Sequence, residues 1–185
     1  MSDLSGHAAE RVRPLIRVRQ VRDFLDRHVA ESELDAIADV ARWSGSSMNT
    51  QPWRFIVLRE KATIKRIADA AMPQTRGLLT APAAIAIALP DEEGEAVSHA
   101  YDEGRAAERI LIAASTLGLG AGISWIMPAN RAAIREILGL PQDRFVRTIV
   151  AIGHPSEAAM KPKSAPGAAR LPRSEVVLAE KWPQG

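Results

Sequence analysis

Residues 83–89 read Ala-Ala-Ile-Ala-Ile-Ala-Leu and are apolar at every position. A strand with one face in water alternates apolar and polar residues, whereas a strand covered on both faces is apolar throughout. The stretch is also far shorter than the ~20 apolar residues that a membrane-spanning helix needs. It therefore predicts a central β-strand that is covered on both faces.

Helical and strand patterns alternate on both sides of this stretch. Apolar residues at helical spacing begin with Leu34 and Ile37, and polar or turn-forming residues separate one pattern from the next. We expect helices over residues 31–43, 61–71, 95–117 and 130–138, the last capped by Asn130, and strands over residues 53–60, 123–126 and 145–152. A mixed sheet with helices packed on it follows, so the fold class is α/β or α+β.

The two ends of the chain carry weaker patterns. Residues 1–13 are expected to form an arm that is mobile or packs on a partner. Residues 15–24 predict a short helix after Pro14, followed by a turn. Residues 156–173 are rich in Pro, Ala, Lys and Arg and indicate an extended tail, while residues 174–178 suggest a final short strand. We expect residues 14–185 to form a single domain, because the chain has the length of one ordinary domain.

The composition is typical of a soluble globular protein, with 46% hydrophobic and 25% charged residues. A net charge of +2 is too balanced to indicate a nucleic-acid partner. Arginine outnumbers lysine 19 to 5, and arginine suits bidentate recognition of phosphate. Several arginines near the two ends could form a phosphate clamp if the ends meet, or could be solvated surface charges: Arg17, Arg19, Arg22, Arg170 and Arg173. The first residues lack the pattern of a signal peptide, so we expect a cytoplasmic location and no membrane partner.

Several catalytic chemistries are excluded by the residues present. Cysteine is absent, which rules out disulfides, thiolate metal sites and thiol catalysis. The four histidines lie far apart without ligand spacing, and no P-loop, HExxH or GxSxG motif occurs, so no metal site is expected. The charged residues of the longest helix are expected to form ion pairs at helical spacing: Asp102, Glu103 and Glu108 with Arg105 and Arg109.

Two short segments invite a functional reading beside an ordinary one. Residues 118–122 (Gly-Leu-Gly-Ala-Gly) follow a helix and precede a strand, which is the reverse of a dinucleotide-binding fingerprint. They form a helix stop at Gly118, or they allow a flat ligand to approach the backbone of residues 120–124. Residues 46–51 (Ser-Ser-Met-Asn-Thr-Gln) form an ordinary turn, or hold amide donors and acceptors on a stiff support that leads into the next strand.

Three segments resemble the flavin-dependent nitroreductase family. Residues 19–24 (Arg-Gln-Val-Arg-Asp-Phe) are similar to the opening motif RRSVRxF of that family. Residues 41–55 are similar to its run AxxAPSxxNxQPWxF, the most specific of the three, and residues 117–125 with 153–155 are similar to its LGLG segment and closing GYP strand. The similarity covers residues 14–178. It implies an α+β fold, a three-layer α-β-α sandwich with a mixed, mainly antiparallel sheet, and a homodimer with two active sites at the subunit interface.

The resemblance also implies a noncovalently bound FMN. Arg19 and Arg22 match positions that grip the FMN phosphate and the pyrimidine edge of the flavin, and Arg170 matches a late position that closes on the phosphate. A loop that faces the isoalloxazine from the neighbouring subunit is matched by Ser46, Ser47, Asn49 and Gln51. A segment that approaches the flavin near its reactive nitrogen is matched by Ile123, Ser124 and Trp125.

The sequence departs from the family motifs at three positions. The first arginine of the opening motif is Val18 here, so the phosphate grip is expected to shift to Arg17 or Arg19. The serine of the same motif is Gln20, which we retain among the expected cofactor-binding residues, and the proline of APS is Gly45.

The implied activity is that of an FMN-dependent NAD(P)H oxidoreductase. FMN performs the electron transfer, which agrees with the absence of an evident nucleophile or acid–base pair. NADH or NADPH would reduce FMN and leave, and a nitroaromatic, quinone or similar acceptor would then take the same slot, with Trp43 or Trp125 as a wall. Arg22 is the candidate for stabilising negative charge on the reduced flavin.

Two alternatives remain open at this point. One is a flavin carrier, or a flavin-consuming or dehalogenating member of the same superfamily, which the short chain and Val18 suggest. The other is an interaction protein without a cofactor, which only the alanine-rich helix over residues 95–117 supports.

Overall fold

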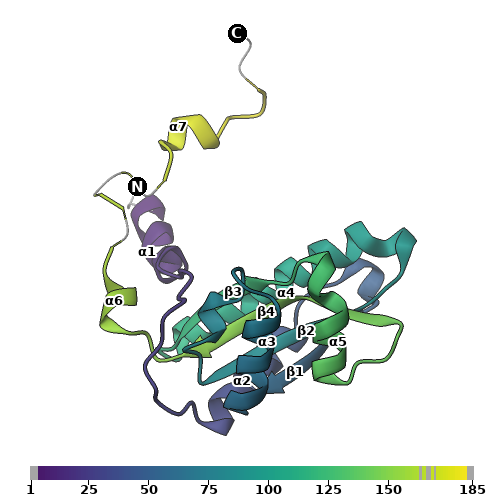
Figure 1. Ribbon diagram of the computed structural model, residues 1–185. Coiled ribbons are helices and arrows are strands. Elements are labelled where there is room, and N and C mark those ends of the chain that lie inside the picture. The colour runs from purple at the N-terminus through teal and green to yellow at the C-terminus, as the bar shows by residue number, and fades with distance from the viewer. Residues whose placement is uncertain (1–3, 163, 166–167, 169, 183–185) are drawn as a thin grey trace.

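The computed structural model describes residues 4–162, 164–165, 168 and 170–182 (Figure 1). Its strands are β1 (Arg54–Leu58), β2 (Ala83–Pro90), β3 (Gly120–Trp125) and β4 (Arg144–Gly153). Its α-helices are α1 (Leu4–Ile16), α2 (Glu31–Arg42), α3 (Lys61–Ala70), α4 (Ala96–Thr116), α5 (Arg131–Leu138), α6 (Glu157–Met160) and α7 (Arg173–Val176). The expected helices between residues 31 and 138 and the four expected strands between residues 53 and 152 are confirmed, with small shifts at their ends.

The strands form one sheet in the order β1-β2-β4-β3. All three pairings between these strands are antiparallel. The expected mixed sheet is therefore reduced, among the described residues, to one isolated parallel bridge between Gln20 and Ala121. β2 is paired on both sides, and its residues from Ala83 to Leu89 are buried, so the predicted central strand is confirmed.

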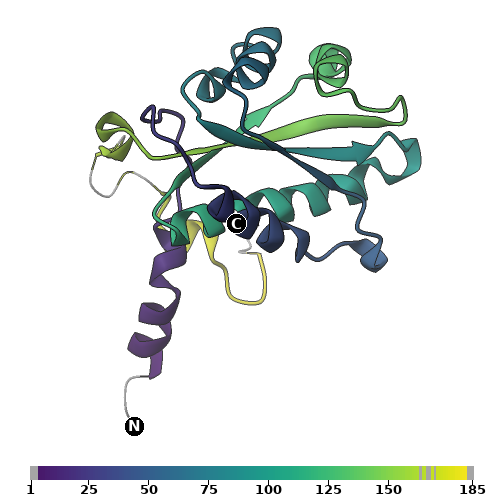
Figure 2. The same cartoon turned by 90° about the horizontal axis from the view of Figure 1, so that it is seen from below.

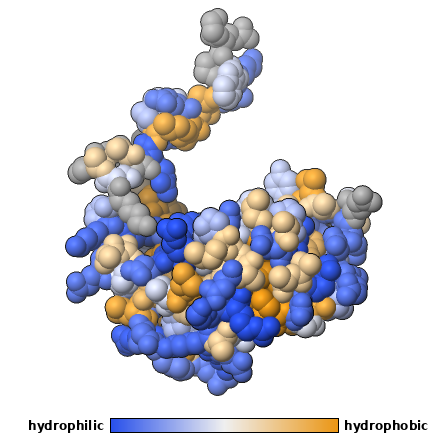
Figure 3. Space-filling model, viewed as in Figure 1, coloured by the Kyte–Doolittle hydropathy of each residue, from blue (hydrophilic) through white to orange (hydrophobic). Residues whose placement is uncertain are grey.

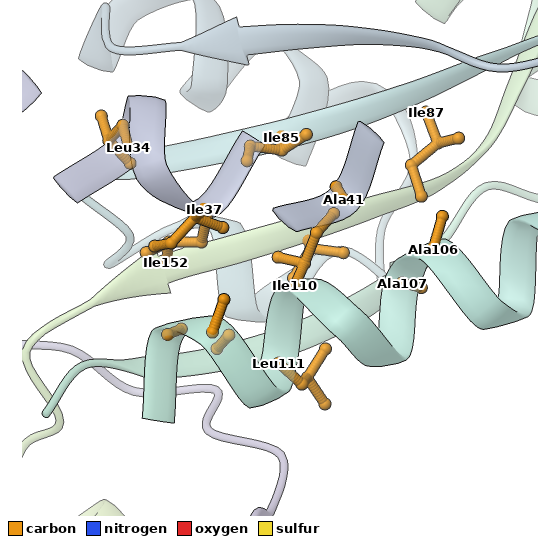
Figure 4. Packing of buried hydrophobic residues seen from close by; sticks show 14 of the residues in the cluster. Leu34, Ile37, Ala41, Ile85, Ile87, Ala106, Ala107, Ile110, Leu111 and Ile152 are labelled. Atoms are coloured by element: carbon orange, nitrogen blue, oxygen red, sulfur yellow. The ribbon is translucent and has the colours of Figure 1, made fainter. Parts of the chain in front are cut away.

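Helices cover both faces of the sheet, which gives three layers (Figure 2). β2 presents Ile85 and Ile87 to the layer of α2 and α4, and presents its smaller alanines to the layer of α3 and α5. On the first face, Ile37 of α2 and Ile110 of α4 pack toward these isoleucines (Figure 4). The period-2 alternation of a strand thus puts large side chains on one face and small ones on the other. The fold class is α+β.

The two ends of the chain differ from the sequence prediction. The helix expected over residues 15–24 is wrong, because α1 ends at Ile16 and the following segment is extended. Pro14 lies in the last turn of α1, where it cannot donate a helical hydrogen bond. The strand expected over residues 174–178 is also wrong, because this part of the tail lies away from the sheet and forms the single turn α7 (Figure 1).

Asn130 stands directly before α5, as expected, but its side chain does not cap that helix. Its Nδ2 instead donates to the carbonyl oxygen of Ala70 at the end of α3, at 2.7 Å. Asn130 therefore ties α5 to α3 in the outer layer.

Gly118 stops α4, as predicted. Its φ of +74° lies in the left-handed region that favours glycine. Its N–H donates to Ser115 O, and the N–H of Leu119 donates to Ala114 O at 2.8 Å. This pair of bonds is the Schellman arrangement that satisfies the last carbonyls of a helix.

Gly120 and Gly122 leave room for the segment between α1 and α2. The N–H of Val21 donates to Ala121 O at 2.8 Å, so this segment runs beside β3. A Cβ on Gly120 would lie 2.9 Å from Cβ of Val21, and a Cβ on Gly122 would overlap the carbonyl oxygen of Val21. The close neighbour of both glycines is thus Val21 of the chain itself, through its side chain at Gly120 and its backbone carbonyl at Gly122.

We expect Gly122→Ala to destabilise the protein and to release the segment around Val21 from β3, because backbone cannot move aside cheaply. The cost should be about 1–3 kcal/mol in urea unfolding. Gly94→Ala is the matched control, since a Cβ there meets nothing within 4 Å. Equal unfolding free energies for the two variants would show that the contact between Val21 and Gly122 is not tight.

Candidate functional site

The first group of predicted site residues gathers at the start of β3. Arg17 and Arg19 line a hollow of about 180 Å³ together with residues from the end of α4, the start of β3 and α6. Nη2 of Arg19 donates to the carbonyl oxygen of Met160 at 2.9 Å and lies 3.3 Å from its sulfur. Arg170 is exposed in the tail between α6 and α7 and is not among the described residues that line the hollow.

Gln20 ties Arg22 to β3. Its Oε1 accepts hydrogen bonds from the backbone N–H of Ile123 at 3.1 Å and from Nη2 of Arg22 at 2.9 Å. This segment is extended, and the first carbons of the Arg22 side chain pack against Gly77. The structure therefore brings Arg19, Gln20, Arg22 and Ile123 to one edge of the sheet.

β3 is an edge strand, and its three predicted site residues face different ways. Side chains alternate along a strand, so Ile123 and Trp125 share one face and Ser124 takes the other. Ser124 is buried, whereas Trp125 is 44% exposed. β4 pairs with β3 on its inner side, and among the described residues the outer side is paired only at Ala121, by the segment of Gln20 and Val21. No strand therefore lies on the outer side of Ile123 to Trp125. Gln20 already accepts from the Ile123 N–H, so this edge offers a ligand the other backbone groups on its outer side.

The second group is the loop of residues 46–51, which contains the 3-10 turn η1 (Ser47–Asn49). Met48, Asn49 and Gln51 have φ values of 47°, 58° and 51°. Non-glycine residues in this region carry backbone strain, which concentrates at functional sites. The N–H of Gln51 donates to Oγ of Ser46 at 2.9 Å, and Nε2 of Gln51 lies 3.3 Å from Oδ1 of Asn49. The loop is therefore internally braced and exposed.

The two groups do not meet within one chain. The loop leads into β1 at one edge of the sheet, and the arginines lie beside β3 at the other edge. Three strand spacings separate these edges by about 14 Å. The loop also contacts α4 at Asp102, whereas the hollow contacts α4 at Ser115, about 20 Å farther along the helix axis. Figure 2 shows η1 beside the N-terminal part of α4 and α1 near its C-terminal end.

A buried charge pair near β3 was missed by the sequence analysis. Glu103 lies on the face of α4 that meets the sheet, and its Oε2 accepts a hydrogen bond from Nε of Arg147 at 2.6 Å. Arg147 is the extra residue of a bulge in β4, since Val146 and Thr148 face consecutive residues of β2. A bulge re-aims a side chain in this way.

The expected pairing along α4 is thus correct for Asp102 and wrong for Glu103. Asp102 lies 3.5 Å from Nη1 of Arg105, as expected. Glu103 is one residue farther, about 100° around the helix, and turns inward. Its position three and four residues before Ala106 and Ala107 was the signal for burial, because those residues mark the apolar face.

The electrostatics of this pair are dominated by burial. Desolvation raises the pKa of Glu103 above its ordinary value of 4.5, and the positive charge of Arg147 opposes this shift. Arg131 of α5 lies over the ring of Phe145, with its Cζ 4.4 Å from the ring centroid. Burial and the nearby Arg147 lower the pKa of Arg131.

The raised pKa of Glu103 has a testable consequence for stability. The folded protein binds this proton more tightly than the unfolded chain, so ionisation of Glu103 opposes folding. The unfolding free energy of the wild type should therefore fall relative to that of Glu103→Gln as pH rises from 4.5 through the raised pKa of Glu103. Urea unfolding across this range measures it, with Glu136→Gln on the exposed face of α5 as control. A wild type that gains stability relative to Glu103→Gln as pH rises would show that Arg147, rather than burial, sets the pKa of Glu103.

Among the described residues, no helix combines the length and the apolar character that a membrane crossing requires.

The chain is similar in sequence to several known proteins. A sequence profile of the nitroreductase family matches residues 17–78 and 76–154. A protein of Archaeoglobus fulgidus, named provisionally as an NADH dehydrogenase/NAD(P)H nitroreductase, is 30% identical over 146 residues, which make up 75% of this chain and 82% of that protein. The FMN reductase (NAD(P)H) of Bacillus subtilis is 28% identical over 174 residues, covering 83% of this chain and 70% of that protein.

A solved structure shares the whole architecture. The FMN-dependent nitroreductase from Clostridium difficile superposes on this chain with a TM-score of 0.78 and 27% sequence identity. The match covers 91% of this chain and 98% of that one. The α+β arrangement described above is therefore shared over nearly the full length of both chains.

Proposed function

This chain belongs to the nitroreductase family, and from that premise we propose that it passes electrons from NADH or NADPH, through bound FMN, to an electron-poor acceptor such as a nitroaromatic or a quinone. The resemblance seen in the sequence is confirmed at the level of the family. The observation that carries the proposal is that Arg17 and Arg19 line a hollow at the start of β3, while Gln20 holds Arg22 beside the same strand.

The residues at this edge suit a phosphorylated, flat cofactor. Arg17 and Arg19 would hold the phosphate, because guanidinium groups bind phosphate through charge-assisted hydrogen bonds. The backbone edge from Ile123 to Trp125 would receive polar groups at the rim of the ring system. Gln20 holds Arg22 beside this edge, where its positive charge favours a negative group. FMN, when bound, supplies the electron transfer itself.

We propose that the site is completed by a second copy of the chain. Ser46, Ser47, Asn49 and Gln51 lie too far from the arginines to share a ligand with them in one chain. In a twofold-symmetric dimer, each loop can face the β3 edge of the other copy. Two identical sites would then form at the interface, each with contributions from both chains.

Exposed apolar surface supports this association. On the outer face of α4, Val97 is 71% and Tyr101 is 73% exposed, and nothing lies within 4 Å of a Cβ at Gly104. Apolar residues are also exposed on the tail around α7 (Figure 3), and Trp182 is 83% exposed. Apolar patches of this kind mark association surfaces.

The acceptor would stack on the exposed face of the cofactor. Trp125 at the end of β3 and Trp43 beside the loop are both exposed aromatic walls. Cζ of Arg42 lies 5.4 Å from the ring centroid of Trp43, within the range of a cation–π contact, and its Nε pairs with Asp39 at 3.0 Å. Electron-poor rings stack well on such walls. The protons that reduction of a quinone or nitro group consumes would come from solvent, to which both walls are exposed. If NADH or NADPH and the acceptor bind in turn at this same site, the reaction follows a ping-pong mechanism.

The purified protein is expected to be yellow and to lose its colour anaerobically when NADH or NADPH is added. Addition of a quinone or nitroaromatic should restore the colour. The visible spectrum near the flavin bands is the measurement. Colour that persists with both nucleotides would contradict the proposed function.

Arg19→Ala should weaken FMN binding, because the phosphate loses a charged hydrogen-bond partner worth about 1.5–3 kcal/mol. Titration of the apoprotein with FMN, followed by fluorescence, measures the affinity. Arg66→Ala on the exposed face of α3 is the matched control for loss of one positive charge. Equal affinities in both variants would place the phosphate elsewhere.

Subunit mixing tests the shared site. Arg19→Ala with Arg22→Ala disables one half of the site, and Asn49→Ala with Gln51→Ala disables the other. A heterodimer of these two chains contains one intact site, so it should recover about half of the wild-type turnover, while each parent homodimer stays low. A heterodimer no more active than its parents would show that each site is built from one chain.

A further inference from the structure

A contact from outside the loop is needed to fix the position of residues 46–51. Three of its residues, Met48, Asn49 and Gln51, have positive φ values, and such strain persists only where the surroundings impose it. Met48 is 95% exposed, so packing of its side chain does not fix the loop. Its internal bonds join Ser46, Asn49 and Gln51 to one another and set its shape, but they do not set its place on the protein.

Asp102 of α4 provides such a contact. Both carboxylate oxygens accept from the backbone N–H of Ser47, at 3.0 and 3.2 Å. Asp102 is only 2% exposed, so its carboxylate is shielded from water although Ser47 is exposed. It attaches the first residue of η1 to the second turn of the longest helix, which itself packs on the sheet.

Arg105 and Gly45 complete the arrangement. Nη1 of Arg105 lies 3.5 Å from the Asp102 carboxylate and balances its charge. The guanidinium passes so close to Gly45 that a Cβ at that position would overlap Nη2 of Arg105. The family motif has proline at the position of Gly45. Because Gly45 has no side chain, the Arg105 guanidinium can fill the space that a side chain would take there.

We propose that Asp102 is a positioning residue for the flavin site, which fixes the loop through Ser47 while Arg105 balances its charge and Gly45 leaves room for Arg105. The inference rests on the proposed function, because the loop is taken to face FMN. Asp102 itself acts through the loop and does not touch the cofactor.

The test compares Asp102→Ala, Asp102→Asn and a variant of similar instability. Asp102→Ala removes the acceptor for Ser47 and should weaken FMN binding roughly tenfold to a hundredfold. Asp102→Asn keeps one acceptor oxygen and should recover most of the affinity. Ile134→Ala, on the buried face of α5, destabilises the fold without contacting the loop and should keep wild-type affinity below its unfolding range. Fluorescence titration with FMN measures all three.

Two further readouts do not depend on turnover. Hydrogen exchange of the Ser47 amide in the FMN-free protein should accelerate in Asp102→Ala and stay slow in Ile134→Ala. The visible circular dichroism of bound FMN should change in Asp102→Ala, because the loop no longer faces the ring in a fixed position. Gly45→Ala should weaken FMN binding in the same direction by displacing Arg105.

The outcomes separate the two proposals. A wild type that binds no FMN would overturn both the proposed function and this inference. A wild type that binds FMN, together with an Asp102→Ala variant that matches Ile134→Ala in affinity and in Ser47 exchange, would overturn the positioning role alone. Unchanged affinity in Gly45→Ala would remove Arg105 and Gly45 from the arrangement.

Discussion

The contact of Val21 with Gly120 and Gly122 underlies the candidate site. No other residue type fits at these two glycines without pushing the Val21 segment off β3. Because that segment lies so close, the Val21 N–H reaches Ala121, and the Gln20 side chain reaches Ile123. This docking also sets the positions of Arg19 and Arg22, because they flank Gln20 and Val21 in the sequence. A glycine-rich stretch that first suggests ligand binding thus works indirectly, by admitting the segment that carries the charged groups.

The length of α4 sets the second constraint. Its second turn holds the polar loop through Asp102, and its last turns line the hollow that contains Arg17 and Arg19. A rigid helix keeps these two features about 20 Å apart, so neither can move to meet the other within one chain. On the proposed function, each chain presents two halves of a site that neither half completes alone. Symmetric association is the simplest geometry that unites them, and the exposed outer face of α4 offers apolar surface for it.

Much of the fold could be predicted from the sequence, because its elements are buried. The stretch at 83–89 is apolar throughout since both faces are covered, and α2 and α3 show their packed faces as helical spacing. Prediction failed where packing is weak: α1 and α7 lie off the body, so no buried pattern marks them. The Glu103–Arg147 pair depends on a bulge in β4, which no local pattern revealed. The family motifs indicated both groups of candidate residues, but only the topology shows that the two groups lie apart.

A crystal structure of the protein purified with FMN tests the central claim most directly. The account predicts FMN with its phosphate at Arg17 or Arg19, its ring beside Ile123 to Trp125, and residues 46–51 of a second copy facing the ring. FMN held against residues 46–51 of the same chain, or bound away from Arg19 and Arg22, would contradict it.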